Sequence, residues 1–504
     1  KYPKLTFRRG FIAVMLKESN IKSLLKQAGK NLAAIDQIAA QLHQNRYPLN
    51  HVLQAYKDYL AYQPDSANAA FNYAYYLSKD ARFETAINWY ERSLELGISG
   101  PEEVHLNIAN IYMDQLRDDT NAREHLQNAL TKNPNFVGAY YNLGNLEEQA
   151  GNRDEAVRNF EQCLRIDPAY ESALARLADT HRFTQVDDPL LLKLAVAVQK
   201  SSNSDLQFAL GKACEQLKNY DKAWQHFSAG NALDKRALPI YNPKQIETVF
   251  QQIKTQCDHD WMAEFQGQSH EPVFICGMFR TGSTLLEQVL ASHSAFDAGG
   301  ESEFFPRLVA KEFSGYPAGL SNLEVAKLRS WQMAHKEHSN KLVGTSSRLT
   351  DKRPDNFLYI GLIKAILPGA KFVITERDWR DVATSIFGMR LGASQSYATT
   401  LENIRHYIGL QTQLVDHWQS ILGPDLIRVR YEDMVSEPRD TIGALLQSLG
   451  EDWEENCLSF HKLNNPVQTA SVWQVREPLH SKSIGRWRNY QKQFEKVFGP
   501  DVNF

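Results

Sequence analysis

The stretch Pro272–His293, PVFICGMFRTGSTLLEQVLASH, decides how the second half of the chain is interpreted. It opens with four apolar residues, 273–276, which predict a buried strand. After Gly282 the apolar residues recur at helical spacing and predict a helix over 284–292. The glycines of the connection, Gly277 and Gly282, stand five residues apart. This is the spacing of a loop whose backbone N–H groups, together with the N-terminus of the following helix, bind a phosphate.

The loop departs in one position from those that bind nucleoside triphosphates. Such loops contain Gly-Lys-Ser/Thr, and their lysine contacts the outer phosphates of ATP. This chain has Gly282-Ser283-Thr284 instead, and Arg280 lies inside the loop. A ligand that carries less charge at that end and needs no Mg²⁺ fits better, and a sulfuryl group on a nucleotide 5′-phosphate is such a ligand. The loop alone leaves a plain strand-to-helix turn open as the alternative.

Length and composition are those of a multidomain globular protein. The chain has 504 residues, of which 43% are hydrophobic and 23% charged, and its net charge of −3 gives no sign of nucleic-acid binding. Its five cysteines are scattered, so neither a disulfide framework nor a zinc site is expected. The apolar run 11–16 is too short for a membrane span or a signal peptide. We expect a cytoplasmic protein without a metal.

A pattern recurs through the first half of the chain at intervals of 33 to 35 residues. A small residue marks each unit, at Ala40, Ala74, Ala109, Gly144, Ala178 and Gly211. Most units then carry an alanine followed by a large apolar residue: Ala86 with Tyr90, Ala122 with Leu126, Ala156 with Phe160, and Ala223 with Phe227. Several units end in a proline, at Pro64, Pro134 and Pro168. We interpret each unit as two closely packed helices, the second of which ends before the proline.

This pattern resembles the tetratricopeptide repeat, and residues 137–168 match it best. The resemblance implies six units that stack as a helical solenoid, with the large apolar residues between the helices. Such solenoids usually present a concave surface to a peptide or partner protein, so we expect the repeats to recruit one. Assembly into a homo-oligomer is the alternative role. The unit at Ala178 has Asp187-Asp188-Pro189 in place of the second signature, and we expect it to be distorted.

The sequence therefore predicts an all-α solenoid followed by an α/β domain. The expected parts are an N-terminal helical segment at 1–26, the solenoid at 27–235, a helical linker at 236–270 and the α/β domain at 271–504. In the last part, strands at 273–276, 371–375 and 426–431 alternate with helices at 284–292, 357–367 and 379–389. This alternation predicts a P-loop-like α/β domain with a central parallel sheet and its ligand at the carboxyl ends of the strands.

A second segment of this domain, KFVITERDWRDVATSIFGM at 371–389, carries further phosphate-binding groups. Arg377 follows the predicted strand and can bind a phosphate through its planar guanidinium, and the Ser385 hydroxyl can add a donor. Pairing of Arg377 with Asp381 is the structural alternative. Together with the glycine loop, this segment indicates two anion sites and hence a nucleotide with phosphates at two ends.

These motifs resemble those of the sulfotransferases that use 3′-phosphoadenosine 5′-phosphosulfate (PAPS), and specifically the tyrosylprotein sulfotransferases. The resemblance covers about residues 272–490, in short blocks. The blocks that match the family are the loop Phe279-Arg280-Thr281-Gly282-Ser283-Thr284, Gly299-Gly300-Glu301, Lys352-Arg353-Pro354, Arg377 with Ser385, Tyr431-Glu432-Asp433, Gln474–Pro478 and Arg486-Trp487.

The resemblance implies a role for each matched residue. Glu301 is expected to be the base that takes the acceptor proton, and Arg280 and Lys352 to be the cations that stabilise the transferring group. Tyr431 would line the adenosine pocket. The residues expected to bind PAPS, and 3′-phosphoadenosine 5′-phosphate (PAP) as product, are Arg280, Thr281, Gly282, Ser283, Thr284, Arg377, Ser385, Arg390, Tyr431, Ser471 and Arg486.

Alternatives remain open for the base and for the acceptor. Glu303 is a rival carboxylate on the same face of an extended segment, and His293, His335 and His338 are alternative bases. The chain departs from the family at Phe279, Gly300 and the place of Arg390, and it lacks the family's lumenal disulfide cysteines. We expect transfer to a tyrosine of a peptide or protein. The alternatives are a carbohydrate or small-metabolite acceptor, and a repeat scaffold whose α/β domain is inactive or binds ATP.

Overall fold

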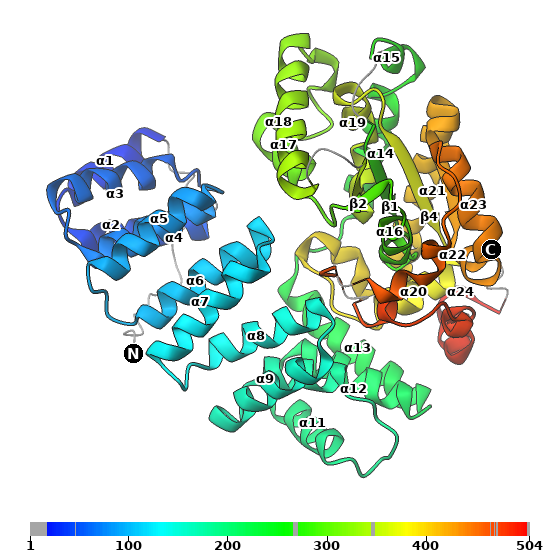
Figure 1. The fold of residues 1–504 in the computed structure, drawn as a ribbon, viewed down its shortest axis with the longest axis horizontal. Coiled ribbons are helices and arrows are strands. Elements are labelled where there is room, and N and C mark those ends of the chain that lie inside the picture. Colours follow the sequence, from blue (N-terminus) through cyan, green and yellow to red (C-terminus); the bar gives the residue numbers. More distant parts are fainter. Residues whose placement is uncertain are drawn as a thin grey trace. The chain divides into compact units, whose positions relative to one another are not determined.

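The computed structural model describes residues 18–45, 47–265, 271–343, 348–463, 465–467, 469 and 472–500 (Figure 1). The chain divides into two compact units, Lys1–Leu146 with Arg165–Pro168, and Glu147–Leu164 with Ala169–Phe504. This division falls inside the repeats, so the later repeat helices belong to the same unit as the α/β domain. The domain boundaries given above stay predictions.

Paired helices make up the first half of the described chain, as the repeat pattern predicts. They are α1 (Glu18–Ala28), α2 (Leu32–Gln44), α3 (Asn50–Tyr62), α4 (Ala67–Lys79), α5 (Phe83–Glu95), α6 (Pro101–Ile111), α7 (Asp119–Lys132), α8 (Val137–Ala150), α9 (Arg153–Ile166), α10 (Glu171–Thr180), α11 (Pro189–Lys200), α12 (Ser204–Gln216) and α13 (Tyr220–Ala237). The prolines Pro64, Pro134 and Pro168 each follow the end of a helix, because proline cannot continue it.

The small residues of the repeats lie where two helices approach each other. A Cβ atom added at Gly211 would lie 2.4 Å from the ring of Phe227, which is itself buried. Tyr90 and Phe160 are buried in the same way, so their predicted place in the core is confirmed. The assignment of Ala40 is wrong: Ala40 is exposed, and its neighbour Ala39 is fully buried because it shares the inner face of α2.

The unit at Ala178 departs from the others, as predicted. Residues 181–188 connect α10 to α11, whereas residues 80–82 suffice between α4 and α5. The Asp188 side chain accepts hydrogen bonds from the N–H groups of Leu190 and Leu191, at 2.8 and 3.4 Å. With Pro189 at the first helical position, Asp-Asp-Pro is therefore the start of α11.

The second half of the chain contains a five-stranded sheet in the order β2-β3-β1-β4-β5, in which all pairings are parallel. The strands are β1 (Val273–Gly277), β2 (Phe296–Ala298), β3 (Arg348–Lys352), β4 (Lys371–Glu376) and β5 (Leu426–Arg430). The sequence predicted β1, β4 and β5 and missed the other two. β2 has only three residues. β3 reads as polar, although its last four residues are buried.

Helices cover both faces of this sheet, in line with the predicted α/β class (Figure 1). Phe274 and Cys276 of β1 pack on one face against the first group of helices, and Val273 and Ile275 pack on the other face against the second. The first group is α14 (Pro243–Gln256), α17 (Phe304–Glu312), α18 (Val325–Val343), α19 (Ile360–Ile366) and α21 (Leu401–Leu422), and the second is α16 (Ser283–Ala291), α22 (Tyr431–Ser436) and α23 (Pro438–Leu449). Such burial on both sides explains the continuous apolar run of β1.

The last repeat helices pack directly on the α/β domain. Asn231 of α13 donates a hydrogen bond of 2.8 Å to the backbone oxygen of Phe387, at the end of α20 (Trp379–Phe387). Trp224 stacks on the Phe387 ring with centroids 4.5 Å apart. The remaining helices are α15 (His259–Ala263) and α24 (Gln491–Phe498). Within the described ranges, no helix has the length and apolar character needed to cross a membrane.

The close approach at Gly211 can be tested by adding a methyl group. We expect Gly211→Ala to lower the free energy of unfolding by about 1–3 kcal/mol, because the added atom overlaps the Phe227 ring. Gly409→Ala is the matched control, since no atom lies within 4 Å of the added Cβ, and it should stabilise by about 0.5–1 kcal/mol. Chemical denaturation measures both. Equal stability of Gly211→Ala and the native protein would contradict the packing described.

Candidate active site

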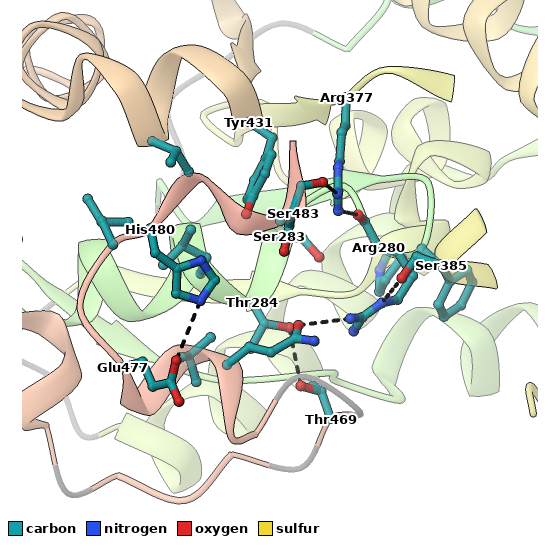
Figure 2. Close-up of a pocket in the computed structure, with 18 of the residues that line it drawn as sticks. Arg280, Ser283, Thr284, Arg377, Ser385, Tyr431, Thr469, Glu477, His480 and Ser483 are labelled. Carbon is teal, nitrogen blue, oxygen red and sulfur yellow. Dashed lines mark hydrogen bonds and ion pairs between the residues drawn. The ribbon is translucent and has the colours of Figure 1, made fainter. Parts of the chain in front are cut away.

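A cavity of about 250 Å³ lies at the carboxyl ends of the strands (Figure 2). It is lined by the loop after β1, by residues that follow β2, β4 and β5, by α20, and by the C-terminal segment. The predicted site residues that line it are Arg280, Gly282, Ser283, Thr284, Glu301, Arg377, Ser385, Tyr431 and Arg486. Residues far apart in the sequence thus meet at one end of the sheet, which is where ligands of open α/β sheets bind.

The loop after β1 requires glycine where it packs closely against Tyr431. Gly282 has φ +95°, and a Cβ atom there would lie 2.7 Å from the Tyr431 ring. The helix α16 begins at Ser283, so its N-terminus is directed to the same place. Thr281 does not line the cavity: its hydroxyl lies 2.6 Å from both Met278 O and Thr375 Oγ1, which fastens the loop to β4.

Arg280, Arg377 and Arg486 converge on this cavity and bring three positive charges together. Arg280 Nε donates to Ser385 Oγ at 2.9 Å (Figure 2). Its Nη2 donates to Gln474 Oε1 at 2.8 Å. Burial and the charges of the other two arginines lower the pKa of Arg280 to about 10. Like charges held this close favour an anion between them, because it removes their mutual repulsion.

Arg377 is held in place at the wall of the cavity by a ring and two backbone oxygens. It lies over the Tyr431 ring at 4.5 Å and donates to Arg280 O at 3.1 Å and to Ser483 O. Its buried Nε has no hydrogen-bond partner among the residues that the structure describes. Asp381, the alternative partner, accepts hydrogen bonds from the N–H groups of Gly485 and Trp487 at 2.7 and 2.9 Å instead. Because its side chain lines the cavity, the Arg377 guanidinium can bind a phosphate there.

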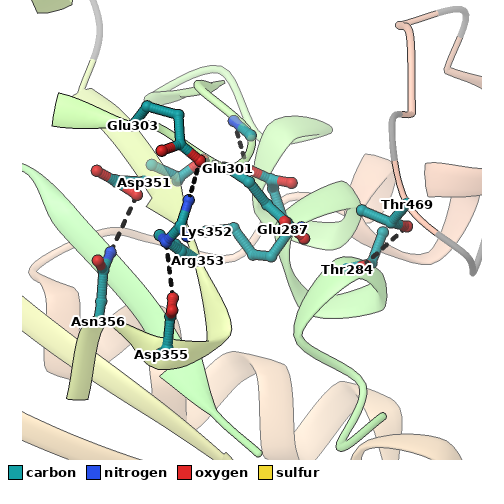
Figure 3. Close-up of polar contacts among 12 residues, drawn as sticks. Thr284, Glu287, Glu301, Glu303, Asp351, Lys352, Arg353, Asp355, Asn356 and Thr469 are labelled. Atoms are coloured by element: carbon teal, nitrogen blue, oxygen red, sulfur yellow. Dashed lines mark hydrogen bonds and ion pairs between the residues drawn. The ribbon is translucent and has the colours of Figure 1, made fainter. Parts of the chain in front are cut away.

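Glu301 and Lys352 form an ion pair at the edge of the cavity (Figure 3). Lys352 Nζ lies 2.6 Å from Glu301 Oε1, and the lysine side chain is 1% exposed whereas that of Glu301 is 36% exposed. Only Glu301 lines the cavity; Lys352 is buried beneath it. The arrangement presents a carboxylate to a ligand and a cation directly behind it.

The backbone around Glu301 is fastened to β3 and α16. Lys352 N donates to Gly300 O at 2.9 Å, and Gly299 N donates to Thr350 O at 2.8 Å. Gly300 N donates to the buried Glu287 carboxylate at 2.9 Å. The position of Glu301 is therefore set by rigid elements on both sides.

The rival bases have partners elsewhere and do not line the cavity. Glu303 pairs with Arg353, which also contacts Asp355 at 2.7 Å. His338 lies 3.0 Å from Ser302 Oγ, and His293 Nε2 lies 2.8 Å from Asp452 O. His335 is 1% exposed and is surrounded by the rings of Phe274, Phe304 and Phe305.

Two further predicted donor residues do not join the cluster. Arg390 does not line the cavity; its guanidinium pairs with Asp205 at 2.9 Å and with Asp234 at 3.5 Å, both on repeat helices. These two carboxylates hold Arg390 outside the cavity. The residues next to Arg390 in the sequence do not indicate that it pairs with them. Ser471 lies outside the described residues.

The C-terminal segment brings residues to the cavity that the sequence did not single out for the site. They are Thr469, Gln474, Glu477, His480 and Ser483. His480 Nε2 lies 3.5 Å from Glu477 Oε2, and its buried Nδ1 has no partner within the described part of the chain (Figure 2). The resemblance of Gln474–Pro478 to the family could have indicated Gln474. No sequence pattern indicated His480, because this segment has neither helical nor strand periodicity. Within the described ranges, no group of three or more metal-ligating side chains is found.

Comparison with known proteins identifies the domain that carries this cavity. Residues 272–455 match the model of the sulfotransferase family, and residues 137–170 match that of the tetratricopeptide repeat. The α/β domain is a sulfotransferase-family domain. The predicted combination of this domain with tetratricopeptide repeats is confirmed.

Similar proteins include an uncharacterized protein of Aquifex aeolicus (strain VF5), 28% identical over 396 residues that cover 75% of this chain and 52% of that protein. The chain thus spans about half the length of this relative. Protein-tyrosine sulfotransferase 2 of Gallus gallus is 21% identical over 300 residues, 55% of this chain and 78% of that protein.

Two solved structures are also similar to parts of the chain. The sulfotransferase domain of the Synechococcus PCC 7002 olefin synthase has a TM-score of 0.35 at 18% identity, over 44% of this chain and 89% of that one. The tetratricopeptide-repeat protein YrrB has a TM-score of 0.28 at 19% identity, over 38% of this chain and 96% of that one.

Proposed function

We propose that the protein transfers the sulfuryl group of PAPS to the hydroxyl group of a tyrosine in a peptide or protein. The observation that carries the proposal is the cavity of the sulfotransferase-family domain, which joins an arginine cluster to the Glu301–Lys352 pair. The arginines suit the phosphates of a donor nucleotide. The carboxylate suits a base for an acceptor hydroxyl.

The shape of the site favours a donor with phosphate groups at two ends. The N-terminus of α16 with Ser283 and Thr284 offers one anion site, and Arg377 with Ser385 and Arg486 offers another. The first site has no lysine at the position that contacts the outer phosphates of ATP. A 5′-phosphosulfate at the first site and a 3′-phosphate at the second would use both. This argues against the ATP-binding alternative.

The proposed transfer makes one bond and breaks one. The acceptor oxygen forms a bond to sulfur in line with the sulfur–oxygen bond to the 5′-phosphate, which breaks with its electron pair on the phosphate oxygen. Glu301 takes the acceptor proton. The loop N–H groups stabilise the negative charge that develops on the transferring and leaving groups. Lys352, buried 2.6 Å behind Glu301, adds a positive charge beneath the carboxylate.

A peptide or protein acceptor is favoured by the relatives and by the repeats. The matched Gallus gallus protein is named as a protein-tyrosine sulfotransferase, and repeat solenoids generally bind extended peptide segments. We infer that the repeats raise the local concentration of such an acceptor near Glu301. A carbohydrate or small metabolite remains the second candidate acceptor, because the side chains around Glu301 do not by themselves select tyrosine.

Donor binding gives the first test. We expect calorimetry to show tight binding of PAP that EDTA leaves unchanged, and weaker binding of ATP. Arg377→Ala should weaken PAP binding by about 1.5–3 kcal/mol, because it removes charge-assisted hydrogen bonds. Arg428→Ala, which removes a partly exposed arginine that pairs with Asp416 and Glu376 outside the cavity, is the control and should bind normally. A requirement for Mg²⁺ or a preference for ATP would contradict the donor assignment.

Substitution of the carboxylates tests the base. Glu301→Gln should retain PAP affinity and lower kcat by about 10²-fold or more, since the amide cannot accept the proton. Glu303→Gln is the matched control, because that carboxylate pairs with Arg353 and does not line the cavity. If the Glu303 variant lost turnover while the Glu301 variant kept it, the assignment would have to be exchanged.

The acceptor can be identified with labelled donor. We expect the full-length protein to transfer labelled sulfate from PAPS to a tyrosine-containing peptide, with no transfer to the same peptide carrying phenylalanine in place of tyrosine. Peptide mapping by mass spectrometry locates the label. Transfer to simple sugars or small alcohols, with none to peptides, would establish the second candidate acceptor.

A further inference from the structure

The C-terminal segment 472–490 lines part of the cavity and also contacts the repeat helices. Gln474 accepts a hydrogen bond from Arg280 at 2.8 Å, and Arg486 belongs to the arginine cluster. We call this segment the strap. Trp473 and Arg476 contact repeat residues 148–153, and Arg486 contacts α12. These repeat residues belong to the same compact unit as the strap.

One end of the strap is fastened to the turn between α8 and α9. Trp473 Nε1 donates to Glu148 Oε1 at 2.9 Å, and the Arg153 guanidinium lies 4.7 Å from the Trp473 ring centroid. Arg476 Nη2 donates to Gln149 O at 3.3 Å. Gly151 has φ +86°, a conformation that favours glycine, and the Arg476 guanidinium lies directly against it, with Nε 2.9 Å from the position of a Cβ atom. The residues on either side of Gln474 and Val475 thus attach the strap to the repeats.

The other end is fastened by an ion pair with α12. Glu215 accepts two hydrogen bonds from Arg486, from Nε at 2.6 Å and from Nη2 at 2.5 Å. The exposed fractions of the two side chains are only 17% and 25%. This two-point contact fixes the plane of the guanidinium as well as its position, which a single hydrogen bond would not do.

The contacts with Glu215 hold the Arg486 guanidinium at the proposed donor site. Arg486 is repelled by Arg280 and Arg377, so an arginine without its carboxylate partner would move away from the cluster toward solvent. With Glu215 in place, Arg486 is already oriented before any ligand arrives. Preorganisation of this kind lowers the cost of binding.

We propose that the repeat residues Glu215 and Glu148 are positioning residues of the donor site: Glu215 orients Arg486 toward the 3′-phosphate of the nucleotide, and Glu148 holds the strap that presents Gln474 to Arg280. The second half of the repeats is therefore a structural part of the transferase. This inference rests on the proposed function only in taking the ligand to be a nucleotide with a 3′-phosphate.

The test compares two nucleotides on the full-length protein by calorimetry, PAP and adenosine 5′-phosphate, which lacks the 3′-phosphate. We expect Glu215→Gln to weaken PAP binding about tenfold or more and to change adenosine 5′-phosphate binding less than twofold. A general loss of structure would reduce both affinities together. Trp473→Phe, which keeps a ring but loses the N–H bonded to Glu148, should weaken both nucleotides several-fold while the denaturant midpoint of unfolding stays unchanged, because Gln474 supports Arg280 beside the loop. Unchanged affinities, or a loss of affinity that follows a loss of stability, would overturn the role of Glu148.

Glu95→Gln is the control, because it removes an exposed carboxylate of repeat helix α5 that pairs with Arg92 at 2.9 Å. It should leave both affinities unchanged. Glu215→Asp provides a second variant if the glutamine form is unstable, since it keeps the charge and loses the two-point geometry, and we expect an intermediate PAP affinity from it. Unchanged or tighter PAP binding by the Glu215 variants would overturn the inference while leaving the proposed function intact. No PAP binding by the native protein would overturn both.

Discussion

The repulsion among Arg280, Arg377 and Arg486 is the constraint on which the site depends. Three guanidinium groups share one cavity, and burial together with the charges of its neighbours lowers the pKa of Arg280 to about 10. The surrounding structure keeps them together through fixed partners: Ser385 and Gln474 for Arg280, backbone oxygens and the Tyr431 ring for Arg377, and Glu215 for Arg486. An anion between the guanidinium groups would stabilise such a cluster, in line with the proposed nucleotide that carries phosphates at two ends.

The parallel sheet makes this convergence possible. The loop after β1, Glu301 after β2, Lys352 at the end of β3, Arg377 after β4 and Tyr431 after β5 all lie at one end of the sheet. Because all pairings are parallel, each strand delivers its following residue to the same edge. The sulfotransferase-family domain thus assembles its cavity from residues that are far apart in the sequence.

Much of this arrangement could be predicted from the sequence, and the failures have physical causes. The apolar runs of β1, β4 and β5 revealed the sheet, and the spacing of Gly277 and Gly282 revealed the loop. β3 was missed because Thr350, Asp351 and Lys352 are buried through partners rather than through apolar character. The partner of Arg486 could not be predicted either, since Glu215 lies in a repeat helix and only the folded chain brings the two together. Arg390 was expected at the donor site for the same reason. Its partners Asp205 and Asp234 also lie in the repeats and could not be predicted from the sequence.

The repeats are thus connected to the sulfotransferase-family domain in two ways, one inferred from the function of such repeats and one seen as direct contacts. The inferred recruitment of an acceptor follows from what such repeats generally do. The contacts of α12, α13 and the α8–α9 turn with the sulfotransferase-family domain are structural, and they make removal of the whole repeat region an ambiguous test of recruitment. Single substitutions in the full-length protein separate the two relations more cleanly, because each removes one contact and leaves the packing of Trp224 on Phe387 in place.

The most direct test of the central claim is a crystal structure of the full-length protein with PAP bound. The account predicts the 5′-phosphate at the N-terminus of α16, beside Ser283 and Thr284, and the 3′-phosphate within hydrogen-bond distance of Arg377 and Arg486. It also predicts that Glu301 and Lys352 lie on the 5′ side of the nucleotide, where the sulfuryl group would be. A nucleotide bound outside this cavity, or one whose 3′-phosphate lies at the glycine loop, would contradict it.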